Sequence, residues 1–152
     1  MASVIDYAAR GKVTSVTDGG IVFTPAGTNY ELHLDVEGGY TGPVGSAIEG
    51  IIRAQGQKLW TVPSGGNFIV PIVGPPRIVQ GRVRRIDEGQ IVIQAGATFI
   101  ISVSQGAGAS SLARGPIALN TMVNVVLMPG ARFELIAKMP GVAARDSVVQ
   151  SA

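Results

Sequence analysis

The sequence contains no cysteine, a single histidine and little charge. Without cysteine the chain has no disulfide framework, no thiol nucleophile and no thiolate metal site. The lone His33 cannot form a histidine cluster, so we expect neither a metal ion nor a bound cofactor. Charged residues make up 14% of the chain, against roughly 25% in typical soluble domains. Such a surface either is partly buried against other chains or carries polar, uncharged loops.

Signals for nucleic acid, export and membrane insertion are also weak. The formal net charge of +2 is too small to indicate nucleic acid by itself. The N-terminus lacks the charged region and apolar run of a secretory signal, so we expect no export by such a signal. Residues 89–113 carry no charge and are long enough to cross a bilayer. They alternate and are rich in Gly, Gln and Ser, which predicts strands and a loop and no membrane span.

Glycine and proline are abundant, with 21 and 9 residues, and favour turns and short strands. The dominant feature is a repeat, because residues 81–93 follow the pattern of residues 11–23. Both stretches have a glycine, a base, a valine, a second aliphatic residue, an acid–glycine turn and then Ile-Val, which predicts two hairpins. Val13 and Val16 lie three residues apart, which predicts a bulge or a twist between them.

Each copy continues with the same succession of short strands. In the first unit we expect strands at 12–17, 20–24, 30–37, 47–54 and 58–62, with a turn at 55–57. In the second unit we expect strands at 77–86, 90–94, 98–104, 120–128 and 132–137, with a long loop at 105–119 and a turn at Pro129-Gly130. Residues 67–73 predict an extra edge strand, where proline is tolerated. The alternation over 30–37 places His33 on a solvated face.

The sequence therefore predicts an all-β protein, a tandem duplication of two small five-stranded barrels packed together with little or no helix. The predicted parts are an N-terminal arm (1–10), unit one (11–62), a proline-rich junction (63–76), unit two (77–137) and a C-terminal tail (138–152). The strand order, with the longest loop between the third and fourth strands, resembles the small barrels of the OB type. An SH3-like barrel or half of a β-sandwich fits these lengths nearly as well.

Comparing the copies indicates a covered surface on unit two. Outward charges of unit one align with apolar residues of unit two. The pairs are Glu31 with Ile100, Glu49 with Val123, and Arg53 with Leu127. We interpret the outer face of unit two as covered by unit one, by another copy or by a different protein.

The only tryptophan allows two interpretations. Either Leu59 or Trp60 must face outward from its strand. An exposed Trp60 would be a binding anchor, whereas we expect Trp60 to be wedged between the two barrels.

A run of arginines marks the second hairpin, namely Arg77, Arg82, Arg84 and Arg85. Such a run can follow the phosphates of a single strand. No aromatic residue is interleaved to stack on bases, and Asp87 and Glu88 neutralise the run locally. The sequence therefore favours a solvated or subunit-contacting hairpin.

No constellation of catalytic residues is present, so we expect no enzyme. The leading hypothesis is a structural protein that packs into a larger shell or virion-type assembly, for example by decorating a capsid. Its partners would be copies of itself or a shell protein, and its location cytoplasmic or virion-associated. The expected interface residues are Ile100, Val123, Leu127 and Trp60. The alternatives are an OB-like module that binds single-stranded nucleic acid through the four arginines, and a carbohydrate- or peptide-binding barrel using Trp60 and Tyr40.

Overall fold

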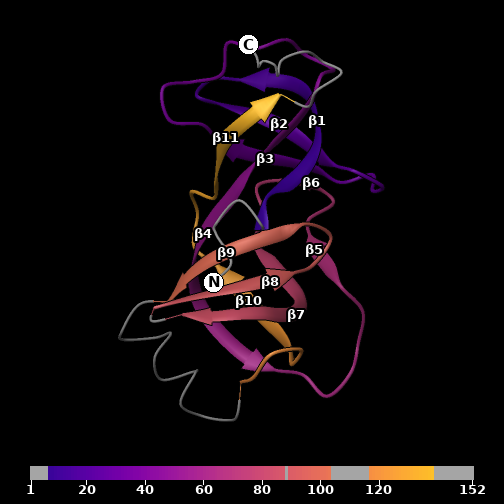
Figure 1. Ribbon diagram of the computed structural model, residues 1–152, viewed down its shortest axis with the longest axis vertical. Helices are drawn as coiled ribbons and strands as arrows, with labels where there is room; N and C mark the ends of the chain where they lie inside the picture. Colours follow the sequence, from indigo (N-terminus) through magenta and orange to yellow (C-terminus); the bar gives the residue numbers. More distant parts are fainter. Residues whose placement is uncertain (1–6, 88, 104–116, 139–152) are drawn as a thin grey trace.

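The computed structural model describes residues 7–87, 89–103 and 117–138. Within these ranges the chain forms eleven strands and no α-helix, so the all-β expectation is confirmed (Figure 1). All strands belong to one mixed sheet. The strands are β1 (Ala9–Thr17), β2 (Gly20–Pro25), β3 (Glu31–Asp35), β4 (Ala47–Thr61), β5 (Phe68–Val70), β6 (Val73–Gly74), β7 (Ile78–Asp87), β8 (Gln90–Gln94), β9 (Thr98–Val103), β10 (Met122–Leu127) and β11 (Arg132–Lys138).

The long strand β4 belongs to two groups of strands. Its first half pairs with β1 and β11, and its second half pairs with β9 and β10. In the first group the pairings lead from β4 through β1, β2, β3 and β11 back to β4. In the second group they lead from β4 through β10, β7, β8 and β9 back to β4. β3 and β11 are joined by one residue pair, Asp35 with Arg132, so the first ring is partial.

The turn expected at 55–57 is wrong, because β4 runs without interruption from Ala47 to Thr61. Gly56 pairs with Val103 on one side and with Leu127 on the other. A Cβ at Gly56 would lie 3.2 Å from the side chain of Ile101 and 3.4 Å from that of Val125. This glycine therefore lets the strand pass closely over packed side chains, whereas its sequence context suggested a turn. The fifth strand expected in unit one therefore lies in the second half of β4 and pairs with β10 of the second group. The fifth strand expected in unit two is β11, which pairs with β4 and β3 of the first group.

The two repeated hairpins form as predicted. β1 pairs with β2 and β7 pairs with β8, both antiparallel. Gly19 and Gly89 have φ angles of 87° and 75° in the two turns, a region that glycine adopts without strain. The predicted bulge is confirmed as a register shift between Val13 and Ser15, and an equivalent shift lies between Val83 and Arg85.

Other parts of the prediction have mixed outcomes. The edge segment forms β5, which pairs with β7, and β6, which pairs with β3, with Pro71 between them. The last two residues of the expected N-terminal arm belong to β1. Most of the expected long loop (104–116) and nearly all of the tail (139–152) lie outside the described residues.

In the part of the chain that the structure describes, no helix is long and apolar enough to span a membrane.

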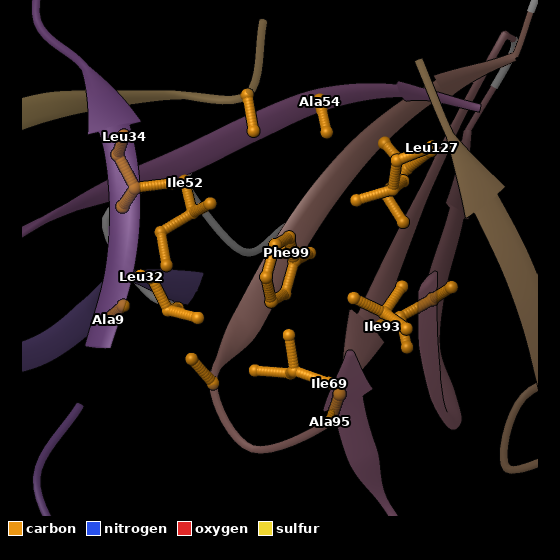
Figure 2. Close-up of a cluster of buried hydrophobic side chains, with 14 of the residues drawn as sticks. Ala9, Leu32, Leu34, Ile52, Ala54, Ile69, Ile93, Ala95, Phe99 and Leu127 are labelled. Atoms are coloured by element: carbon orange, nitrogen blue, oxygen red, sulfur yellow. The ribbon is translucent and has the colours of Figure 1, made fainter. Parts of the chain in front are cut away.

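A single large core joins the two strand groups. Leu32 and Leu34 on β3, Ile52 on β4 and Phe99 on β9 point into the same interior (Figure 2). Phe99 and Ile52 are fully buried. Because both groups contribute to this core, they fold as one body, with their strands at opposite ends of the long axis in Figure 1.

Candidate functional site

Two of the expected interface residues face the interior. Val123 and Leu127 are buried in the main core, which corrects the expectation that they point outward. Gly11 lies opposite Ile48 in the β1–β4 pairing, and Gly81 lies opposite Val123 in the β7–β10 pairing. By this pattern Val123 matches the buried Ile48. The alignment with Glu49 was shifted by one residue, and a shift of one residue exchanges the two faces of a strand.

Ile100 does lie on an outer face, but the same chain covers it. It forms a second small cluster with the buried Ile51 and Val92. Tyr7, Ala8 and Ile136 pack against this cluster. The outer face of β9 is therefore covered at Ile100, as expected, and the covering residues belong to the same chain.

Trp60 is the one expected interface residue that reaches solvent. It is 42% exposed, whereas Leu59 is 3% exposed and takes the core position. The expectation that Trp60 is wedged between the two barrels is therefore wrong. Trp60 pairs with Asn124 on β10, which pairs with Gln80 on β7, which pairs with Phe68 on β5. These four residues form one row across the outer side of the sheet.

We call the outer side of β5, β7, β10 and the second half of β4 the Trp60 face. Successive side chains of a strand point to opposite faces of the sheet. The residues on the Trp60 face are therefore those that alternate with the core residues of these four strands. They are Lys58, Trp60, Phe68, Val70, Ile78, Gln80, Arg82, Met122, Asn124 and Val126. Apolar side chains predominate, and Val70 is as exposed as Trp60. No carboxylate is present among these ten residues, so the face is apolar with a positive charge.

The centre of this face is partly covered by the chain itself. Gln80 Nε2 donates a hydrogen bond of 2.9 Å to the carbonyl oxygen of Gly66. Gln80 and its neighbour Asn124 are both buried. The β4–β5 connection thus crosses one part of the Trp60 face and leaves Trp60 and Val70 open on either side of it.

The sequence prediction missed most of this face, although a signal for it exists. β7 begins with Ile78-Val79, and β10 contains Val125-Val126. In each pair one residue, Val79 or Val125, packs in the core. Its neighbour, Ile78 or Val126, lies on the Trp60 face. A strand that is apolar on both sides is typically covered on both sides.

The four arginines have different environments. Arg82 donates a hydrogen bond of 2.9 Å from Nη1 to the carbonyl oxygen of Asn120. Arg85 forms an ion pair with Asp87, 2.9 Å from Nε to Oδ2. Hydrogen bonds to Asp87 and then to Tyr7 raise the pKa of the Arg85 guanidinium. Arg77 and Arg84 are exposed. Arg82 and Arg85 are thus held by separate partners, and Trp60 lies two strands away from Arg82.

Tyr40 and Trp60, the residues of the carbohydrate- or peptide-binding alternative, are not brought together. Tyr40 lines a cavity of about 600 Å³ beside β11 that does not include Trp60. Its hydroxyl donates to the carbonyl oxygen of Pro43 at 3.0 Å, and burial raises the pKa of Tyr40.

A neighbouring cavity of about 500 Å³ is lined by an Arg–Glu–Arg cluster. Glu134 accepts from Arg53 Nε at 2.8 Å and lies 3.6 Å from Arg132 Nε. The Glu134 carboxylate thus forms ion pairs with two guanidinium groups, and these contacts make it poorly suited to proton transfer. Within the described ranges no three His, Cys, Asp or Glu side chains are grouped so that they could hold a metal ion. His33 is exposed on β3, as its alternation pattern predicts.

Comparison with known proteins gives no match to a protein-family model, a curated protein or a solved structure.

Proposed function

We propose that this chain is a non-enzymatic assembly protein that docks onto other protein surfaces through the Trp60 face. The observation that carries the proposal is the exposed Trp60 on an apolar sheet face without carboxylates. Tryptophan is among the residues most enriched at binding hot spots. An exposed apolar patch of a few hundred Å² is often a functional part of a protein surface.

The size of the face favours a repeated, weak contact. Four strands about 4.8 Å apart, each with a few residues on this side, give a footprint of roughly 300 Å², of which the β4–β5 connection covers a part. A stable pair of proteins buries about 800 Å² per partner. Many small contacts of this size suit a protein that packs into a lattice, such as a shell or virion-type assembly that it decorates.

We also propose that the two strand groups are copies of one five-stranded, OB-like barrel that exchange their fifth strands. β1, β2, β3 and the first half of β4 would be strands one to four of the first copy. β7, β8, β9 and β10 would be those of the second. The second half of β4 runs parallel to β9, and β11 pairs parallel with β3. Each fifth strand therefore has the same direction relative to its third strand.

Replacing Trp60 with alanine tests the docking proposal. In sedimentation velocity over a concentration series, we expect the wild-type chain to form larger species and Trp60→Ala to weaken this association at least tenfold (about 1.4 kcal/mol or more). The matched control is Val44→Ala, because Val44 is 56% exposed and lies in the β3–β4 connection. Equal loss in both variants would remove the special role of Trp60. A single-stranded oligonucleotide added at low salt should leave the sedimentation unchanged.

A further inference from the structure

The charges that lack an ion-pair partner are separated along the molecule. The described ion pairs join Arg10 with Glu49, Arg53 and Arg132 with Glu134, and Arg85 with Asp87. Among the remaining charged residues of the described strands and turns, the acids all belong to the first strand group. Four of the bases belong to the second group, and the first group holds the bases Lys12 on β1 and Lys138 at the end of β11. The acids are Asp18, Glu31, Asp35 and Glu37, and the bases of the second group are Lys58, Arg77, Arg82 and Arg84.

We call Asp18, Asp35 and Glu37 the acidic end. Asp35 pairs with Gly20, next to the turn that contains Asp18. The amide of Val36 donates to the carbonyl oxygen of Gly19 at 2.9 Å, which holds the start of the β3–β4 connection against this turn. All three carboxylates are exposed. The acidic end lies where β2 and β3 meet, in the upper part of the molecule in Figure 1.

The opposite end carries the basic side chains around the Trp60 face. Lys58 and Arg82 lie on this face, and Arg77 immediately precedes β7. Within the described ranges none of the three forms an ion pair. β7, β10 and the end of β4 occupy the lower part of the molecule in Figure 1. Two complementary charged surfaces thus lie far apart on one chain.

We infer that the Trp60 face docks on the acidic end of a second copy of this chain, head to tail. This inference rests on the proposed function and names the partner of that face. Packing two Trp60 faces against each other would bring their cations together, which opposes association. The acidic end offers the opposite charge, and Val16, 44% exposed near Asp18, offers an apolar side chain to the contact.

A row of copies joined head to tail leaves a free Trp60 face on the copy at one terminus and a free acidic end on the copy at the other. Such an interface continues to add copies, and it produces a ring if the rotation closes or an open filament if it does not. A small contact of this kind can therefore build an extended array without any second interface.

Charge reversal of each surface tests the inference. We use Lys58→Glu/Arg82→Glu for the face and Asp35→Lys/Glu37→Lys for the acidic end, with circular dichroism to verify folding. By sedimentation velocity at about 50 mM salt, each variant alone should associate at least about tenfold more weakly than wild type. An equimolar mixture should regain the large species, because each variant carries the complement of the other. Raising the salt to about 500 mM should weaken the wild-type association.

The control is Lys12→Glu, which changes the charge by the same sign outside the basic end and should not weaken association. Wild-type association in either variant alone, or no recovery in the mixture, would overturn the head-to-tail contact. If Trp60→Ala abolishes association while both charge variants retain it, the docking face stands and the acidic partner surface is wrong. If Trp60→Ala associates as wild type does, the proposed function itself fails.

Discussion

Replacing Phe133 with alanine is expected to lower the free energy of unfolding by about 3–5 kcal/mol. Phe133 is 2% exposed, and its ring centroid lies 4.8 Å from that of Phe23 on β2. Gly50 on β4 lies directly under the ring, where a Cβ would overlap it. This side chain fastens β11 to the first strand group, so its removal leaves a cavity between three strands. Urea denaturation followed by far-UV circular dichroism measures the change.

The control for this variant lies on the same strand. Leu135 is 46% exposed, so Leu135→Ala should change the free energy of unfolding by less than about 0.5 kcal/mol. A loss below about 1 kcal/mol for Phe133→Ala would mean that β11 does not pack into the core of the first group.

Replacing Gly81 or Gly11 with alanine is expected to destabilise the fold by about 3 kcal/mol in each case. A Cβ at Gly81 would overlap the carbonyl oxygen of Gln94 and lie 2.9 Å from the Cα of Ala95. A Cβ at Gly11 would overlap the carbonyl oxygen of Thr24 in the same way. These neighbours are backbone atoms, so relief of the overlap requires the paired strands to separate. Thermal melting monitored by circular dichroism gives the comparison.

Gly66 provides the matched glycine control. No atom lies within 4 Å of a Cβ built there, so Gly66→Ala should melt within a few degrees of wild type. Similar losses at Gly11 and Gly81 would support the equivalence of the two hairpins. A Gly81→Ala variant that melts with the wild type would show that the close approach of β7 to β8 is not required.

The sequence predicted the elements that depend on local patterns. Acid–glycine turns and alternating apolar residues placed both hairpins, the bulge and the regular strand β3. Local patterns did not predict that the strand continues through residues 55–57. Gln-Gly-Gln is compatible with a turn and with a strand, and the contacts of Gly56 with Ile101 and Val125 come from distant parts of the chain.

The candidate site was only partly predictable for a similar reason. Leu59 and Trp60 are both apolar, so only the pairing with β10 decides which of them faces the core. The equivalence of Val123 with Glu49 is wrong by one residue, because only the strand pairing fixes the register, and a shift of one residue exchanges the inner and outer faces. The face itself combines strands from residues 58 to 126, which no local pattern joins.

Trp60 lies on one face with β10, β7 and β5 only if β4 is one continuous strand. Double electron–electron resonance measures the distance between spin labels at the two ends of β4. The labels are attached to an Ala47→Cys/Thr61→Cys variant, since the chain has no cysteine of its own. A continuous strand between these positions predicts a label separation of roughly 40 Å. A turn at 55–57 would fold residue 61 back beside the first half of the strand. A label separation of about 20 Å or less would therefore show that β4 is not continuous and that Trp60 does not join this face.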